Sequence, residues 1–280
     1  MSRLRDLSPS SGSTTGYSLI ELLVTMTLSS IVLAGIVWEF GFVSRTRMDL
    51  EQLVEAQQSA RAAIAVITQE MRQAGACLPR TGDPVALNGT DGGTRDTLTL
   101  RIGRVRRNDL TCIRVQLSAA APQGSSVLQV QSTSGFTADS LVYVRGSTGS
   151  GNTFTVSGVS MNSLLLSTPL DAYYDATSWV YALEERTYAV DASGDPPVLT
   201  VRIDGGAPQP LVPGVEAFNV QYVTTPCPPC DTLDAPQDDE EWLLVREVGI
   251  EVTVRSRKPN RAGEYMRLTS RSNIKPRNLL

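Results

Sequence analysis

One early carboxylate and four cysteines are the residues of this 280-residue sequence whose positions could carry chemistry. Glu21 lies five residues after Gly16, at the start of the uncharged stretch 22–38. A carboxylate in a membrane span is unfavourable unless another group pairs with it. No basic residue lies within one helical turn of Glu21 in the sequence. Its partner must therefore be the amino terminus of its own chain or a group on another subunit.

The stretch Leu19–Val43 is long and apolar enough to cross a membrane as a helix. Its 25 residues would span roughly 35 Å, against a hydrocarbon core of about 30 Å. Its only charged residues are Glu21 and Glu39. We expect the helix in a membrane, either as a plain anchor or packed against other helices through its small residues. Those residues are Thr25, Thr27, Ser29, Ser30, Ala34 and Gly35.

After Ser44 the pattern becomes that of an amphipathic helix. A mostly apolar seam recurs every three or four residues, and charged side chains lie off the seam. Gly75 and Pro79 are suitable stop signals, so we expect one helix over about residues 17–74, with its second half outside the bilayer. We favour packing of the seam on a sheet over a coiled coil with another chain, because strands follow directly. The seam residues are Leu50, Leu53, Gln57, Ala60, Ile64, Ile67, Met71 and Ala74.

The run from Gly16 to Glu21, which reads Gly-Tyr-Ser-Leu-Ile-Glu before the apolar stretch, resembles the cleavage site of type IV prepilins and type II secretion pseudopilins. The resemblance implies that a prepilin peptidase cuts between Gly16 and Tyr17, and that Tyr17 becomes the N-methylated first residue. It also implies that Glu21 pairs with the amine of an adjacent subunit and sets the register of assembly. The family usually has phenylalanine where this chain has Tyr17, and tyrosine keeps the ring. The alternative is that residues 1–16 are a disordered tail on an ordinary single-span membrane protein.

From residue 97 onward, apolar residues recur with a period of two, which is typical of strands. Clusters of glycine, proline, aspartate and asparagine separate these segments, as in antiparallel sheets. The expected fold class is therefore α+β: a long N-terminal helix packed on a β-rich antiparallel globular domain, as in pilins. The expected strands are 97–102, 112–117, 127–131, 141–145, 153–156, 163–166, 179–183, 186–190, 198–203, 215–223, 245–255 and 265–271.

The later part of the chain is similar to minor pilins of the PilW class and to pseudopilin J of type II secretion. The similarity covers residues 16–76 well and residues 184–280 loosely. Residues 118–180, rich in serine, threonine and glycine, fit less well and are interpreted as an insertion. An insertion can carry a specialised surface or be a β-rich elaboration with no separate role. The segments that carry the similarity are 69–75, 186–190, 199–202, 211–222, 248–256 and 276–278.

The four cysteines, Cys77, Cys112, Cys227 and Cys230, are expected to form disulfides, because a domain outside the cytoplasm lies in an oxidising environment. Four cysteines allow three connectivities. We favour Cys77–Cys112, which would clamp the end of the helix to the sheet, together with Cys227–Cys230. The Cys-Pro-Pro-Cys spacing of the second pair invites a redox interpretation, but the motif lacks a thioredoxin-like setting. A zinc site formed by all four thiolates is the other alternative.

The composition argues against several classes of function. The sequence contains no histidine, which removes Ser-His-Asp and Cys-His nucleophile systems and the commonest metal ligand. The net charge of −4 argues against a nucleic-acid binder, and the basic cluster at residues 101–107 lacks aromatic side chains for base stacking. The acidic residues 238–241 lack the spacing of an EF-hand and are expected to form a solvated turn. We expect no enzyme activity, no cofactor and no bound metal.

The sequence is interpreted as a minor pilin that joins a pilin complex and primes or caps type IV pilus assembly. The expected divisions are a leader peptide at 1–16, a transmembrane half helix at 17–43, an amphipathic half helix at 44–76 and a periplasmic globular domain at 77–280. The resemblance implies the bacterial inner membrane as location, and prepilin peptidase, other minor pilins and the major pilin as partners. A J-like type II secretion pseudopilin is the nearer alternative. A membrane-anchored adhesin or ligand-binding module, with residues 118–180 as its binding surface, is the more distant one.

Overall fold

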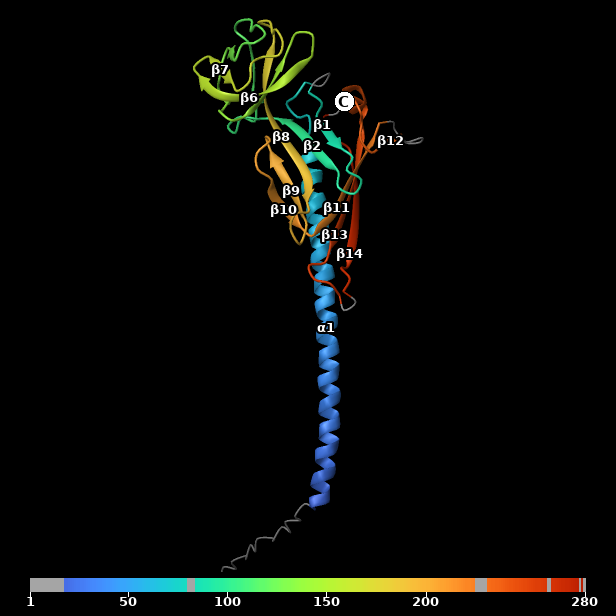
Figure 1. The fold of residues 1–280 in the computed structure, drawn as a ribbon. Helices are drawn as coiled ribbons and strands as arrows, with labels where there is room; N and C mark the ends of the chain where they lie inside the picture. Colours follow the sequence, from blue (N-terminus) through green and yellow to red (C-terminus); the bar gives the residue numbers. More distant parts are fainter. Residues whose placement is uncertain (1–17, 80–83, 225–230, 261–262, 277, 279–280) are drawn as a thin grey trace, which may run out of the picture. The chain divides into compact units, whose positions relative to one another are not determined.

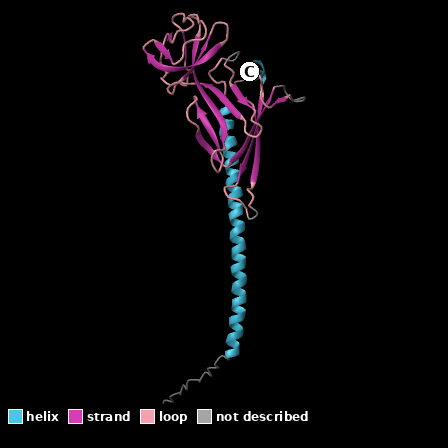
Figure 2. Cartoon of the chain, in the orientation of Figure 1, coloured by secondary structure: helices cyan, strands magenta, loops and turns pink. Residues whose placement is uncertain are grey.

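The computed structural model describes residues 18–79, 84–224, 231–260, 263–276 and 278. The chain divides into two compact units, and the boundary between Glu51 and Gln52 falls inside the first helix. The described part of the first unit is helical, whereas the strands belong to the second unit (Figure 1). One long helix and a strand-rich remainder are also evident in Figure 2. The predicted α+β class is confirmed.

The described residues contain two α-helices and fourteen strands. The helices are α1 (Leu19–Met71) and α2 (Asp239–Leu244). The strands are β1 (Leu87–Thr90), β2 (Thr97–Gly103), β3 (Arg114–Gln116), β4 (Val127–Gln129), β5 (Leu141–Arg145), β6 (Gly151–Ser160), β7 (Ser163–Leu166), β8 (Trp179–Asp191), β9 (Val198–Ile203), β10 (Gln209–Pro213), β11 (Val215–Val223), β12 (Thr232–Leu233), β13 (Glu247–Arg255) and β14 (Arg267–Ile274).

The first half of α1 is apolar and exposed. The stretch Leu19–Val43 has a mean hydropathy of 2.1, and its most apolar part is not buried inside the protein. By length and composition this helix could cross a membrane. Thr25, Thr27 and Ser30 donate their hydroxyls to carbonyl oxygens one turn earlier, at 2.8–3.0 Å. These polar groups are therefore satisfied within the helix, which makes them compatible with a hydrocarbon environment.

The second half of α1, from Gln52 onward, buries one face in the globular domain. The predicted seam is correct over its later part, from Ala60 to Ala74, but Leu50 at its start is 58% exposed. The seam also omitted Ala56 and Ala63, because its strict period of 3.5 residues describes a narrower stripe than the face that a globular domain covers. Small side chains allow the strands to approach the helix closely. The buried positions recur every three or four residues: Ala56, Ala60, Ala63, Ile67, Met71 and Ala74.

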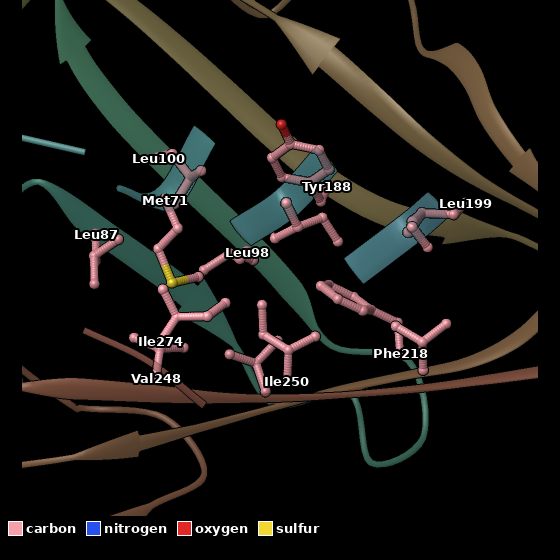
Figure 3. Packing of buried hydrophobic residues seen from close by; sticks show 14 of the residues in the cluster. Met71, Leu87, Leu98, Leu100, Tyr188, Leu199, Phe218, Val248, Ile250 and Ile274 are labelled. Carbon is pink, nitrogen blue, oxygen red and sulfur yellow. The ribbon is translucent and has the colours of Figure 1, made fainter. Parts of the chain in front are cut away.

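The main hydrophobic core lies between α1 and two sheets. Figure 3 shows Met71 with Leu100 to one side of it and Ile274 to the other. Phe218 and Ile250 contribute to the same core from the four-stranded sheet. Each large apolar side chain buried in this way contributes about 1.5–3 kcal/mol. The shared core holds the second half of the helix and both sheets together as one unit.

A four-stranded antiparallel sheet, in the order β12-β11-β13-β14, forms one side of this core. Along β13 the buried and less buried residues alternate without interruption. Val248, Ile250, Val252 and Val254 point into the core. The opposite face carries polar and charged side chains, as is common for antiparallel sheets with one solvated face.

Strand β8 is shared between two parts of the larger sheet. Its first residues pair with β5 and β3, and its later residues pair with β2 and β9. The sequence predicted two strands here, 179–183 and 186–190, separated at Glu184 and Glu185. That separation is wrong, because both carboxylates form ion pairs with arginines of β2 and β8 and remain in the strand.

The first part of β8 belongs to a small closed barrel. Its strands run in the order β3, β8, β5, β6, β7 and β4, with antiparallel neighbours. Hydrogen bonds from Ser118 N to Gln129 O (2.9 Å) and from Gln131 N to Gln116 O (3.1 Å) bring β4 back beside β3. A second hydrophobic core, made of residues between 113 and 182, fills the barrel. Closure removes free strand edges from this part of the molecule.

The sequence did not predict β1, β10, β12 or α2. Strand β1 contains Asn88 and Gly89, which together are typical of a turn. Glycine is required there because a Cβ would collide with the Tyr222 hydroxyl. Strand β10 contains two prolines and pairs with β9 at the end of the sheet, where a missing N–H is tolerated.

A buried carboxylate connects the two sheets. Asp96 is 4% exposed and accepts hydrogen bonds from Val220 N at 2.7 Å and from Gly92 N at 2.9 Å. Burial raises the pKa of Asp96 above its ordinary value, and the two N–H bonds oppose this shift. With a raised native-state pKa, the folded protein binds the proton more readily than the unfolded chain. The contribution of Asp96 to the free energy of unfolding therefore falls as pH rises from about 4 through the raised value.

Asp96→Asn is expected to lower the free energy of unfolding by about 1–3 kcal/mol, because one acceptor oxygen becomes a donor that faces a backbone N–H. The difference in free energy of unfolding between the variant and the unchanged protein should be largest below about pH 4 and should become smaller as pH rises. Urea unfolding of the full-length chain in detergent, repeated across this pH range, measures both effects. If the difference in free energy of unfolding between Asp96→Asn and the unchanged protein became larger as pH rises, it would contradict the raised pKa of Asp96.

Candidate functional site

Ser18 and Glu21 form the start of α1. The carbonyl oxygen of Ser18 accepts the N–H groups of Glu21 and Leu22 at 3.0 and 3.2 Å, so Ser18 occupies the N-cap position. Serine followed three residues later by glutamate is the spacing of a capping box, a signal that the sequence analysis overlooked. The carboxylate of Glu21 also lies near the positive end of the helix dipole, where an anion is favourable.

The position of Glu21 leaves its carboxylate accessible. Glu21 is exposed, as is Glu39 near the other end of the apolar stretch. A group from another molecule can therefore reach either carboxylate, but only Glu21 lies in the first turn, beside the amino terminus that cleavage would create. The predicted processing site, Gly16 and Tyr17, lies outside the described residues and stays a prediction.

The end of α1 is fixed to the globular domain by a covalent bond and by close packing. Cys77 and Cys112 form a disulfide, the pairing that the sequence analysis favoured. The N–H of Gly103 donates to the carbonyl oxygen of Ala76 at 2.7 Å. Gly103 must be glycine, since a Cβ there would lie 2.7 Å from the Cβ of Cys77. The turn after the helix is therefore held against β2.

The disulfide between Cys77 and Cys112 excludes one of the alternative roles considered for the four cysteines. Because Cys77 and Cys112 are bonded to each other, the alternative of a zinc site formed by all four thiolates is wrong. Cys227 and Cys230 lie outside the described residues, so their pairing stays a prediction.

A partly buried ion pair positions α1 on β8. The Nη1 atom of Arg186 lies 2.5 Å from Oε1 of Glu70, and its Nη2 atom lies 2.5 Å from Oε1 of Glu184. Burial is the largest influence on Glu70 and raises its pKa, while the charge and hydrogen bond of Arg186 act in the opposite direction. Removing one member would leave a desolvated charge without its partner, so the pair fixes the helix in one register.

Two of the four arginines in the basic cluster at residues 101–107 form ion pairs within the chain. Arg101 Nε lies 2.9 Å from Glu185 Oε2, and Arg104 forms an ion pair with Asp204. The later arginines of the cluster line, with Arg104, a polar cavity of about 730 Å³. Ion pairs within the fold therefore account for Arg101 and Arg104, whereas Arg106 and Arg107 line the cavity.

The acidic residues 238–241 begin α2, so the predicted turn is wrong. Asp238 is the N-cap, and its side chain accepts a hydrogen bond from Glu241 N at 2.9 Å. Trp242 is buried and packs edge-on against Tyr222, with ring centroids 4.7 Å apart. This aromatic contact anchors a helix too short to be stable alone.

Residues 13–37 match the prokaryotic N-terminal methylation motif. The match includes Gly16, Tyr17, Glu21 and the first part of α1, and it covers less than a tenth of the chain. It therefore describes the N-terminal segment and not the globular domain. No curated protein matches the sequence.

The motif and the apolar helix support a type IV pilin-like protein, a class that includes pseudopilins. The motif implies processing by a prepilin peptidase and assembly with other pilins. The same features are consistent with a single-pass membrane anchor, and they suggest a structural protein rather than an enzyme.

Proposed function

We propose that this protein is a minor pilin of the PilW class that joins a complex of pilins and primes or caps type IV pilus assembly. The observation that carries the proposal is the methylation motif at residues 13–37, followed by Glu21 in the first turn of an exposed apolar helix. A carboxylate in this place favours assembly through an ion pair rather than a simple anchor.

In the proposed mechanism, Glu21 directs the addition of the subunit. Cleavage after Gly16 gives a methylated amine at Tyr17, about one helical turn from Glu21, so the two can pair within a free monomer. On assembly, Glu21 exchanges this amine for that of a neighbouring subunit. An unpaired carboxylate in lipid is unfavourable, so the pairing supplies both attraction and register.

The proposed arrangement assigns a place to each segment. Residues 1–16 are the leader, residues 17–43 lie in the bacterial inner membrane, and residues 44–76 carry the periplasmic domain 77–280 outside it. We infer that residues 118–180 are an insertion. The separate hydrophobic core of the barrel, drawn from residues between 113 and 182, supports this inference.

Two other functions use the same features. A J-like pseudopilin of type II secretion would share the methylation motif and the role of Glu21, and neighbouring genes for a pilus or for a secretion system separate the two machines. An adhesin or ligand-binding module would use the barrel as an independent binding unit, which its separate core favours. Binding by the protein in the absence of other pilins would support that function.

Mass spectrometry of protein extracted from membranes is expected to show a mature chain that begins at N-methylated Tyr17. Gly16→Ala is expected to be cleaved, whereas Gly16→Leu is expected to keep its leader, because a bulky side chain occupies the position before the cut. A strain without prepilin peptidase provides the control. A chain that begins at Met1 or Ser2 in cells with an active peptidase would overturn the proposed function.

A further inference from the structure

Strand β14 forms a long edge of the four-stranded sheet. It pairs with β13 through eight consecutive residue pairs, from Val248–Ile274 to Arg255–Arg267. Within the described ranges, no second strand pairs with β14, and no backbone hydrogen bond joins it to a segment other than β13. Alternate residues of an antiparallel strand direct their N–H and C=O groups away from the neighbour. One row of these groups along β14 is therefore available to another chain.

The edge lacks most of the features that prevent strands from pairing. Strand β14 contains no proline, and its register with β13 has no bulge. Its eight residues also make it long for an edge strand, whereas β12 at the other end of the sheet has two. The protective feature that β14 does carry is charge.

Three cations are spaced along the edge. Arg267 and Arg271 lie four residues apart and therefore on the same face of β14, and Lys275 continues this spacing one residue beyond the strand. Their side chains are 56%, 76% and 80% exposed. Each cation forms an ion pair with a glutamate of β11 or β13. Because each side chain is more than half exposed, a group on another molecule can also reach it.

The row of cations selects among possible partners. If two copies of β14 paired antiparallel about Arg271, then Arg271 would face its own copy and Arg267 would face Lys275. Like charges directly opposite each other are destabilising. A strand with carboxylates at every fourth position would instead place an opposite charge across from each cation, which is stabilising. In this register the edge is thus unfavourable for self-pairing, and it is favourable for an acidic partner.

A hollow beside the edge offers space for a side chain of that partner. Gly249 of β13, opposite Asn273 of β14, lines a cavity of about 410 Å³ on the polar face of the sheet. Its walls are mainly amide and charged groups, which suit a polar side chain. The other lining side chains include Asn219, Gln221, Glu251 and Arg271.

We propose that β14 receives an extended segment of another protein as an added strand. The acidic residues of this segment lie on the face of the sheet that bears Arg267, Arg271 and Lys275. The main-chain hydrogen bonds of the added strand supply affinity, and the three cations supply selectivity. The inference rests on the edge and its charges, and it does not depend on the proposed role in pilus assembly.

Hydrogen exchange of the full-length protein in detergent micelles tests the proposal with a pair of capped peptides. One peptide, Glu-Val-Thr-Val-Glu-Val-Thr-Val-Glu, places glutamate at every fourth residue, and its control has lysine in place of each glutamate. In the free protein, alternate amides of β14 are expected to exchange rapidly. The glutamate peptide is expected to protect those amides, and the lysine peptide is expected to leave them unprotected.

Charge reversal at the edge provides the matched variants. Arg271→Glu is expected to weaken binding of the glutamate peptide about fivefold or more, whereas Arg202→Glu, at an exposed position of β9, is expected to leave it unchanged. The proposal is overturned if alternate β14 amides already exchange slowly in the free protein, or if both peptides protect equally. Protection that rises with protein concentration alone would also overturn it, because a second copy would then be the occupant.

Discussion

Glu21→Val is expected to leave cleavage and membrane insertion intact and to weaken association with partner pilins by about 5- to 150-fold. This range corresponds to the loss of about 1–3 kcal/mol. It lies at or below the cost of roughly 2.5–3.5 kcal/mol for a charge at the centre of a membrane span, because Glu21 lies near one end of the apolar stretch. Insertion should become slightly more favourable, because valine replaces a carboxylate. Co-purification of partner pilins after gentle extraction measures the association, and piliation in a complemented strain measures its consequence.

Two further variants distinguish the role of Glu21 in the ion pair from its role in capping the helix and from a general effect of a charge in the apolar stretch. Glu21→Gln keeps the capping box with Ser18 but removes the charge, so it should fail in assembly as Glu21→Val does. Glu39→Val removes the other carboxylate of the apolar stretch and should assemble normally. If Glu21→Gln assembled fully, the carboxylate would act only in capping the helix. A fully competent Glu21→Val would reduce α1 to an anchor.

The helix and many strands were predictable because their signals are local. A continuous apolar stretch and a period of two are properties of neighbouring residues in the sequence. The face of α1 was predicted less well, since Ala56 and Ala63 are buried although they lie beside the predicted seam and not on it. Their burial depends on how closely the strands approach, and that distance is set by the complete core rather than by the helix sequence.

Features formed by distant segments were not predictable from the sequence. Closure of the barrel depends on Gln116 and Gln131 meeting through the backbone, and polar residues of this kind carry no pairing signal. Asp96 bridges the sheets by accepting the N–H of Val220, which lies more than a hundred residues later. Nothing near Asp96 in the sequence distinguishes it from a surface carboxylate.

The candidate site was predictable to the extent that its chemistry is local. Ser18 and Glu21 are close in sequence, so the capping box could have been found from spacing alone. The pairing of Cys77 with Cys112 was favoured from their positions after the helix and at an early strand, and the structure contains it. The position of β14 at the edge of its sheet could be found only from the order of the strands. An edge strand and a central strand can show the same period of apolar residues in the sequence.

Replacing both Cys77 and Cys112 with serine is expected to lower the free energy of unfolding by about 3–4 kcal/mol. The disulfide joins residues separated by 35 positions, and a closed loop of this length restricts the unfolded chain substantially. Hydrogen bonds from Gly75 N to Arg101 O (2.9 Å) and from Gly103 N to Ala76 O (2.7 Å) should keep the helix end in place without the disulfide. The native structure should therefore persist.

The lower free energy of unfolding of the Cys77 and Cys112 double variant should appear as a shift of the whole urea transition. Hydrogen exchange of the Gly75 and Gly103 amides in native conditions should change little. Replacing Cys227 and Cys230 with serine is the matched control, because a bond between them would close a far shorter loop and contribute less. If the Cys77 and Cys112 double variant lost no more stability than this control, loop length would not explain the stabilisation. Rapid exchange confined to the end of α1 would show instead that the disulfide acts on the native helix end, so that the turn at Gly75 depends on the covalent bond rather than on its hydrogen bonds to β2.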